Sequence, residues 1–311
     1  MTETAQEEPV LRNVEFGVGT WSWGDQLWWG FGRGYTTEDV RQVFEASIAA
    51  GIRLFDTAEV YGQGRSETML GEFVRASQEQ VLVATKFMPF PYRLRRASLL
   101  RALRGSLKRL GLERVDLYQI HTYLPPVTPE TWMAAMTEAV QAGLTRAVGV
   151  SNYDRNLTQR AYDALAREGI SLASNQVEYS LLNRKIEKNG LLKQCQDLGV
   201  TVIAYSPLAM GILSGKYTVD NPPPGIRGGR YSRRVLERMT PLLTLMKRIG
   251  SDHAGKTPSQ VALNWTICKG TLPIPGAKNL EQAEQNAGAL DWRLSDDEVA
   301  ALDEAAERAE G

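Results

Sequence analysis

The sequence is poor in cysteine and histidine, with two residues of each among 311. The two cysteines, Cys195 and Cys268, argue against a disulfide framework and supply too few thiols for a cysteine-rich zinc site. Two histidines argue against a multi-histidine metal centre, so we expect no metal. Charge of one sign is not in excess either, because 36 Lys and Arg residues balance 36 Asp and Glu residues. Composition therefore gives no general attraction to nucleic acid or to an anionic membrane, and we expect neither as a partner.

Long apolar runs are also lacking. The first ten residues, MTETAQEEPV, are acidic and polar and do not resemble a secretory signal. No later stretch reaches the roughly 18 apolar residues of a membrane span. Hydrophobic residues nevertheless make up 43% of the chain and charged residues 23%, which is enough to bury a substantial core. We expect a cytoplasmic protein with a flexible tail over residues 1–10 and a single domain over residues 11–311.

Short β-branched runs alternate with segments of helical length along almost the whole chain. Such alternation predicts a parallel sheet, and eight repeats predict its closure into a (β/α)8 TIM barrel. A doubly wound sheet is the alternative, but no G-x-G-x-x-G motif stands between the first strand and the first helix. The predicted strands are Phe16–Thr20, Ile52–Asp56, Val81–Lys86, Val115–Ile120, Thr145–Val150, Ala173–Val177, Thr201–Tyr205 and Thr271–Pro275.

Several segments depart from a minimal barrel. Loops that follow strands lie at the catalytic face of a TIM barrel, so the long loops Trp23–Tyr35 and Asn221–Arg234 are predicted to bind a ligand there. The chain also carries an extra helix near Pro241–Asp252 and a final polar helix over Ser295–Glu310. The residue before the first predicted helix, Thr36, is typical of a helix N-cap.

Four ionisable side chains fall at or just after three consecutive strand ends. Asp56 ends the second strand and Tyr61 follows in its loop, while Lys86 ends the third strand and His121 follows the fourth. Each one alone is more simply explained as a cap, a solvated strand end, a rim aromatic or a structural histidine. Together they favour a site, because a buried lysine needs a partner and Asp56 stands on the neighbouring strand.

This group is suited to donate a proton from a phenol. A tyrosine with its ordinary pKa of about 10 is a poor acid near neutrality. A nearby ammonium lowers that pKa, and Asp56 would keep Lys86 charged and oriented. A neutral His121 would hydrogen-bond to the substrate oxygen. A hydrolase is not indicated, since the sequence has no G-x-S-x-G motif and neither cysteine has an obvious histidine partner.

The sequence resembles the aldo-keto reductases over nearly its whole length, from Gly17 to about Leu290. The resemblance implies an NADP(H)-dependent oxidoreductase that reduces aldehydes or ketones by direct hydride transfer without a metal. Tyr61 would be the general acid, with Asp56, Lys86 and His121 completing a tetrad. The motifs that carry it are FDTAEVYG (55–62), ATK (84–86), YQIH (118–121), GVSN (149–152), NQVEYS (175–180), AYSPLAMGILSGKY (204–217) and IPGAKNLEQAEQN (274–286).

A cofactor site is implied by the same resemblance. The nicotinamide carboxamide would be held by Ser151, Asn152 and Gln176, and Tyr205 would stack on the ring. Further residues would line the pyrophosphate (Ser206, Pro207, Leu208, Gly211 and Lys216) and the adenosine end (Gly276, Lys278, Gln282, Gln285 and Asn286).

Two departures from the family pattern concern charge. Many relatives carry an arginine where Gln282 stands, so Lys278 is the nearby charge for a 2′-phosphate and the strictness of the NADPH preference stays open. An arginine of the segment 221–234 is also expected to reach the cofactor. Arg227 and Arg230 are the two candidates for that contact.

The tryptophan-rich first loop predicts an apolar substrate pocket lined by Trp21, Trp23 and Trp28, with Met88 after the third strand contributing to the same wall. Such a wall suits aryl or medium-chain aldehydes. Ordinary packing of a long loop on the barrel rim is the alternative. The expected partner is a small-molecule carbonyl substrate. Its identity, the direction of the reaction in the cell and the oligomeric state stay open, and the sequence is compatible with a monomer.

A second hypothesis belongs to another functional class. The segment 276–286 is similar to the potassium-channel β-subunit branch of the same family, which predicts a cofactor-binding redox-sensing or regulatory subunit with slow turnover. Only about ten residues precede the first predicted strand region, so the long inactivating extension of that branch is not expected. This favours the enzyme.

Overall fold

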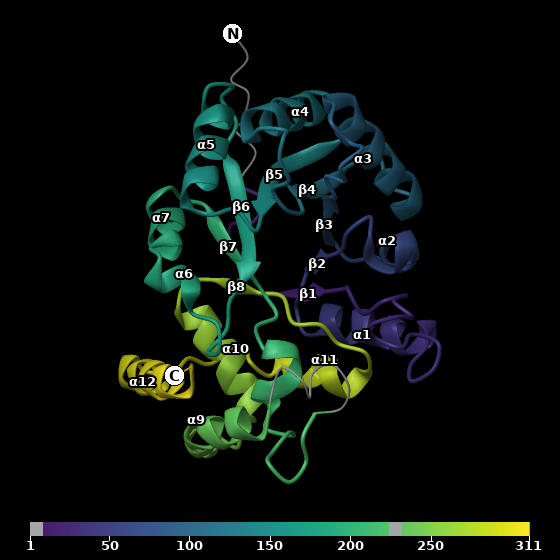
Figure 1. Cartoon of the computed structure of the whole chain (residues 1–311). Helices are drawn as coiled ribbons and strands as arrows, with labels where there is room; N and C mark the ends of the chain where they lie inside the picture. Colours follow the sequence, from purple (N-terminus) through teal and green to yellow (C-terminus); the bar gives the residue numbers. More distant parts are fainter. Residues whose placement is uncertain (1–8, 224–231, 311) are drawn as a thin grey trace.

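The computed structural model describes residues 9–223 and 232–310. It confirms the predicted barrel: one sheet contains eight parallel strands in chain order, and helices surround it (Figure 1). Every predicted strand is found within two residues of its expected bounds. The strands are β1 Gly17–Gly19, β2 Leu54–Asp56, β3 Leu82–Phe87, β4 Val115–Ile120, β5 Thr145–Ser151, β6 Leu172–Glu178, β7 Thr201–Tyr205 and β8 Leu272–Pro273.

The first and last strands meet through very few contacts. Gly19 forms an isolated parallel bridge with Gly276, and its N–H donates to the Pro275 carbonyl at 3.1 Å. A Cβ atom at Gly19 would lie 2.8 Å from the Ile274 carbonyl oxygen, so this close approach requires glycine. The barrel therefore closes where the end of β1 meets the loop that follows β8.

The helices begin and end where local signals place them. Thr36 caps α1 in a reciprocal box with Asp39, and Gly111 ends α3 with a left-handed backbone. The helices are α1 Thr37–Ala49, α2 Arg65–Ala76, α3 Arg96–Leu110, α4 Pro129–Gln141, α5 Arg155–Ala166, α6 Lys185–Lys188, α7 Leu191–Asp197, α9 Arg233–Asp252, α10 Pro258–Cys268, α11 Leu280–Ala287 and α12 Asp296–Glu310, with short 3-10 turns η1 Tyr61–Gly64 and η2 Ala209–Ser214. Among the described residues, none of these helices combines the length and the apolar character needed to cross a bilayer.

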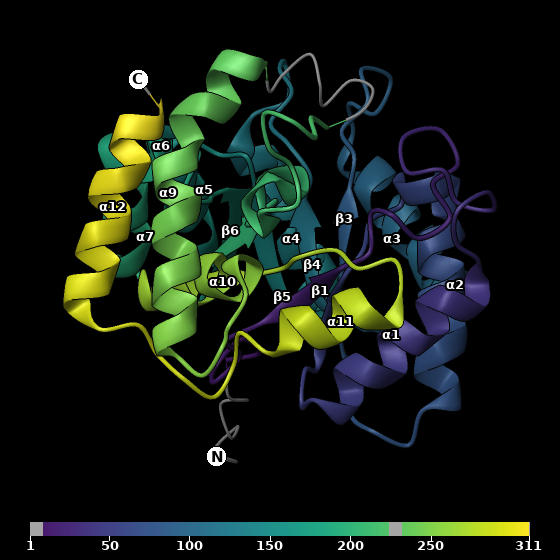
Figure 2. The ribbon, with the colours of Figure 1, turned by 90° about the horizontal axis from the view of Figure 1, so that it is seen from below.

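The extra helix α9 differs from the prediction. It begins at Arg233 and carries Pro241 in its interior, whereas the sequence predicts a start near Pro241. A proline costs a helix interior about 3 kcal/mol. Buried side chains on both sides of Pro241, Leu236 and Met239 before it and Leu242 after it, pack as one stripe and offset that cost. The helix α9 lies beside α12 outside the ring (Figure 2), as expected of extra C-terminal helices.

The barrel interior is apolar at one end. Leu54, Ala84, Leu117, Ile203 and Leu272 point inward and form a buried cluster. A larger core fills the space between the sheet and the surrounding helices. Because side chains alternate along a strand, residues two positions further along each strand also face inward, in the next layer. That layer contains the candidate site.

Candidate active site

The second inward layer of the barrel is polar. Two positions after the apolar residues of β2, β3 and β4 stand Asp56, Lys86 and Gln119, and β6 supplies Ser174 and Gln176. All five side chains are almost completely buried. Buried polar groups of this kind must satisfy one another, because no solvent reaches them. The sequence thus builds a polar network on an apolar floor at the C-terminal end of the strands.

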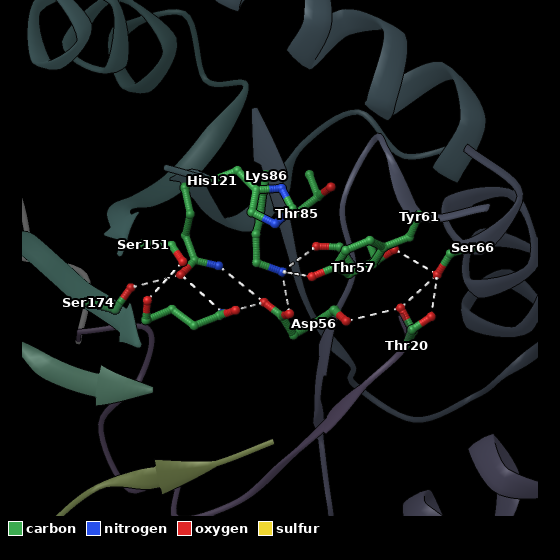
Figure 3. Close-up of polar contacts among 12 residues, drawn as sticks. Thr20, Asp56, Thr57, Tyr61, Ser66, Thr85, Lys86, His121, Ser151 and Ser174 are labelled. Carbon is green, nitrogen blue, oxygen red and sulfur yellow. Dashed lines mark hydrogen bonds and ion pairs between the residues drawn. The ribbon is translucent and has the colours of Figure 1, made fainter. Parts of the chain in front are cut away.

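Asp56 and Lys86 form the ion pair predicted from their positions on neighbouring strands. The Lys86 Nζ atom donates to Asp56 Oδ1, to the Thr57 carbonyl at 2.9 Å and to Tyr61 Oη at 3.3 Å (Figure 3). An ammonium has three N–H donors, so each of them has an acceptor here. Burial by itself would lower the pKa of Lys86, but Asp56 and Tyr61 outweigh burial and raise it. Lys86 is therefore charged at neutral pH.

A cluster of three hydroxyl groups anchors the segment that carries Tyr61. Ser66, at the start of α2, lies 2.7 Å from Thr20 Oγ1 and accepts from Thr57 Oγ1 at 2.9 Å, and Thr20 Oγ1 also donates to the Asp56 carbonyl at 3.0 Å (Figure 3). These contacts join β1, the end of β2 and α2. The turn between Thr57 and Ser66 is thereby held at both ends, and it presents Tyr61 to Lys86.

The pKa of Tyr61 differs from the sequence expectation in its net direction. Burial raises the pKa, Lys86 lowers it and Asp56 raises it, and the outcome lies above the usual value for a phenol. The predicted lowering by Lys86 is present but is smaller than the effect of burial. Tyr61 is consequently held as a neutral phenol, hydrogen-bonded to a cation that favours its ionised form.

His121 lies directly after β4, with its ring edge-on to Tyr61 and the two ring centroids 5.7 Å apart. Burial, and next the charge of Lys86, lower its pKa to about 3. The imidazole is thus neutral near pH 7, as predicted. Its Nδ1 atom is buried and has no hydrogen-bond partner within the described part of the chain. A bound molecule or water normally satisfies such an atom.

The lowered pKa predicts an acid-dependent loss of stability. The unfolded chain protonates His121 below about pH 6.5, while the folded chain does so only near pH 3, so stability falls as the pH drops between these values. Between about pH 7 and about pH 4.5 we expect His121 to account for roughly 2.5 kcal/mol of lost unfolding free energy. Urea unfolding of wild type and His121→Gln at both pH values measures this difference. His253→Gln is the matched control. If the unfolding free energy of His121→Gln fell with pH as steeply as that of wild type, the result would contradict the assignment.

The residues expected to hold a nicotinamide form a connected group. Asn152 donates to Ser151 Oγ and to the His121 carbonyl, each at 3.1 Å, and accepts from Tyr205 Oη at 3.0 Å. Ser151 Oγ donates to the Gln176 carbonyl at 2.8 Å. Asn152 adopts φ +59°, a left-handed backbone that costs about 1 kcal/mol outside glycine. The structure brings these four predicted residues together beside the tetrad.

The expected pyrophosphate loop follows β7. Ser206, Ala209, Met210 and Gly211 all have left-handed backbones, and Pro207 and Leu208 lie between them. Strain of this kind clusters at ligand-binding segments. Lys216 is exposed, with its ammonium 4.8 Å from the Tyr217 ring centroid. Arg227 and Arg230, the two arginines considered for a contact with the cofactor, lie outside the described residues.

The expected adenosine end lies at the loop after β8 and the start of α11. Gln282 Oε1 accepts from the Lys278 N–H at 3.0 Å, so this amide belongs to the helix cap. Asn286 donates to the Gly276 carbonyl at 3.4 Å, and Gln285 is half-buried on α11. Lys278 donates to the Trp29 carbonyl at 3.1 Å, and its ammonium lies 4.7 Å from the Trp29 ring. The first loop of the barrel thus holds the lysine expected to meet a 2′-phosphate.

The four residues predicted to line a substrate pocket occupy different environments. Trp21 is 41% exposed, with its ring centroid 6.3 Å from that of Tyr61. Trp28 is 66% exposed, and Met88 is half-buried. The expectation for Trp23 is wrong: its side chain has no exposed surface and packs on Phe73. A fully buried indole belongs to the core, because it has no surface left for a substrate.

Sequence reasoning missed two contributors near the site. Gln119 lies within the quoted YQIH motif, two positions before His121, and alternation along β4 could have placed it in the same inward layer. Glu59 accepts from the Met88 N–H at 2.8 Å and pairs with Arg93. That carboxylate fixes the loop after β3 to the segment that carries Tyr61.

Comparisons with known proteins agree with this geometry. The Aldo/keto reductase family profile matches residues 15–307. The chain is 41% identical over 304 residues to the chloroplastic pyridoxal reductase of Arabidopsis thaliana, covering 93% of this chain and 82% of that protein. It is 33% identical over 301 residues to L-glyceraldehyde 3-phosphate reductase of Escherichia coli (strain K12), covering 89% and 86%. The structure of an aldo/keto reductase from Klebsiella pneumoniae in complex with NADP and acetate is similar, with a TM-score of 0.72 and 31% identity over 93% and 90% of the two chains.

Proposed function

The chain belongs to the aldo/keto reductase family, and on that premise we propose that it reduces aldehydes or ketones to alcohols at Tyr61 with NADP(H). The observation that carries the proposal is the buried Asp56–Lys86 pair with its hydrogen bond to Tyr61 Oη, next to the neutral His121. The similar Klebsiella pneumoniae structure contains NADP, which supports the choice of cofactor.

The residues around the tetrad fit a nicotinamide cofactor. The buried Nδ1 atom of His121 has no partner among the described residues, and the loop after β7 has left-handed backbones at Ser206, Ala209 and Met210, a strain that is common at ligand-binding segments. Ser151, Asn152 and Gln176 would hold the carboxamide, and Lys278 with the start of α11 would face the 2′-phosphate. When bound, the reduced nicotinamide supplies the hydride that adds to the carbonyl carbon.

The protein's own groups handle the proton. Tyr61 donates its hydroxyl proton to the carbonyl oxygen as negative charge develops there. Lys86 stabilises the phenolate that Tyr61 becomes, and Asp56 holds Lys86 in place. His121 is neutral, so its N–H donates a hydrogen bond to the same oxygen without adding a competing charge. Each role uses a contact or a protonation state that the fold provides before substrate arrives.

The aromatic rim favours an aryl aldehyde as substrate. Trp21 is tilted by 31° against Tyr61 and keeps a large exposed surface beside it. A flat ring next to the reacting carbonyl would cover that surface and exclude water. The printed name of the Arabidopsis thaliana relative, pyridoxal reductase, supports this class, since pyridoxal is an aromatic aldehyde.

Steady-state turnover tests the proposal. Oxidation of NADPH is measured with 4-nitrobenzaldehyde and with pyridoxal, and NADH is measured in parallel. We expect multiple turnovers with NADPH, a kcat in the range of about 1 to about 10³ per second that is usual for enzymes, and a lower kcat/KM with NADH. Heat-denatured protein is the control for the uncatalysed reaction.

Two other outcomes would redirect the assignment. Tight NADPH binding, followed by cofactor fluorescence, without turnover of any aldehyde would favour the regulatory or redox-sensing subunit over the enzyme. Equal kcat/KM values with NADPH and NADH would contradict the role of Lys278 toward a 2′-phosphate while leaving carbonyl reduction intact.

A further inference from the structure

Gln119 is a buried glutamine that the tetrad does not include. It lies on β4 opposite Lys86 of β3, and its side chain has no exposed surface. Its Nε2 atom donates to Asp56 Oδ2 at 3.2 Å. Its Oε1 atom accepts from Ser174 Oγ at 3.4 Å and lies 3.5 Å from Gln176 Nε2. It contacts the carboxylate of the ion pair and does not contact Tyr61 or His121 in any of these interactions.

The hydrogen bonds of the Asp56 carboxylate divide between its two oxygens. Oδ1 accepts from Lys86, while Oδ2 accepts from Gln119 at 3.2 Å and from Gln176 at 2.8 Å. A carboxylate only accepts, so both glutamines must turn their Nε2 atoms toward it. Two amides therefore share the negative charge of Asp56 with Lys86.

Gln176 has a second role in the proposed function, as a residue that would hold the nicotinamide carboxamide. Both side-chain hydrogen bonds that it makes among the described residues run through Nε2, toward Asp56 and Gln119. Gln119 thus fixes the amide that stands between the ion pair and the proposed cofactor residues Ser151 and Asn152. Gln119 therefore holds the side chains of both Asp56 and Gln176 in place.

We propose that Gln119 is a positioning residue that tunes Tyr61 through the Asp56–Lys86 pair. A hydrogen bond to a carboxylate stabilises its charge, which weakens the pull of Asp56 on Lys86. Lys86 then keeps its donor directed at Tyr61 Oη, 3.3 Å away. Without Gln119, Asp56 attracts Lys86 more strongly. Lys86 then stabilises the ionised form of Tyr61 less. This inference rests on the proposed function of Tyr61.

Gln119→Met tests the proposal, because methionine keeps the length of the side chain and removes the donor. We expect kcat for aldehyde reduction to fall about tenfold, with the aldehyde KM changed by less than about threefold. The alkaline limb of kcat, measured from about pH 6 to about pH 11, should move up by about half a unit. Gln194→Met makes the same exchange on α7, where Gln194 bonds to Arg155 and Gln159, and should leave all three quantities unchanged.

A structural role alone would lower the melting temperature of Gln119→Met without moving the alkaline limb, and that result would overturn the proposal. A raised KM with unchanged kcat would overturn it too. If Gln119→Met does not fold, Gln119→Leu removes the same donor with a smaller apolar side chain. It should then shift the alkaline limb upward by a similar amount, and a limb at the wild-type position would again contradict tuning through Asp56.

A readout without turnover separates this inference from the proposed function. The tyrosinate absorbance that is lost in Tyr61→Phe reports the ionisation of Tyr61 in the protein alone. Gln119→Met should raise the pH at which this signal develops, even if no aldehyde is turned over. An unchanged signal would overturn the inference, whereas absence of turnover by wild type would overturn the function alone.

Discussion

Tyr61→Phe is expected to lower kcat for aldehyde reduction by roughly 10²- to 10⁴-fold, the range typical of losing a positioned general acid. The substitution keeps the ring and removes only the hydroxyl, whose oxygen accepts from Lys86 Nζ at 3.3 Å. The ring contacts with Trp21 and with the Lys86 ammonium, 4.9 Å from the Tyr61 centroid, can persist. Stopped-flow or steady-state oxidation of NADPH measures the loss.

Binding and folding serve as controls for this result. We expect the NADPH Kd of Tyr61→Phe to stay within about threefold of wild type, since the hydroxyl acts on the developing charge of the transition state. Tyr162→Phe makes the same exchange on α5, outside the site, and should retain wild-type kcat. If Tyr61→Phe kept more than about a tenth of the wild-type kcat, another group would be the acid.

Most of the barrel could be predicted from the sequence because its signals are local. Most strands are short apolar runs, and several of the neighbouring helices have recognisable caps, such as Thr36 before α1 or Gly111 after α3. The ends of these strands then place Asp56, Lys86 and His121 at one face, because all strands are parallel. The contact between Asp56 and Lys86 follows from that arrangement alone.

The features that the sequence could not predict depend on contacts between distant segments. Trp23 and Trp21 stand two residues apart in one loop, yet the first fills the core and the second lies exposed beside Tyr61. Lys278 lies against Trp29, nearly the whole chain away in sequence. No local pattern distinguishes such partners. The pKa of Tyr61 is a similar case, since burial opposes the effect of Lys86 and only the packed structure shows which one is larger.

Lys86→Met is expected to abolish turnover and also to destabilise the fold by about 3–5 kcal/mol. The substitution leaves Asp56, which is 2% exposed, as a buried carboxylate without its cation. Gln119 and Gln176 still donate to Oδ2, but two neutral amides do not replace a full charge. The phenolate of Tyr61 loses its stabilising cation in the same step. Urea unfolding and NADPH oxidation, measured on one preparation, report both effects.

The double variant Asp56→Asn/Lys86→Met separates stability from catalysis. An asparagine is neutral and keeps an oxygen that accepts from the two glutamines, so we expect most of the lost unfolding free energy to return. Turnover should stay at least about 10²-fold below wild type, because Tyr61 still lacks its cation. Recovery of both quantities would show that the charge of Lys86 is not needed for proton transfer. Recovery of neither would mean that Lys86 stabilises the fold through its packing and its bond to the Thr57 carbonyl, with the charge of Asp56 secondary.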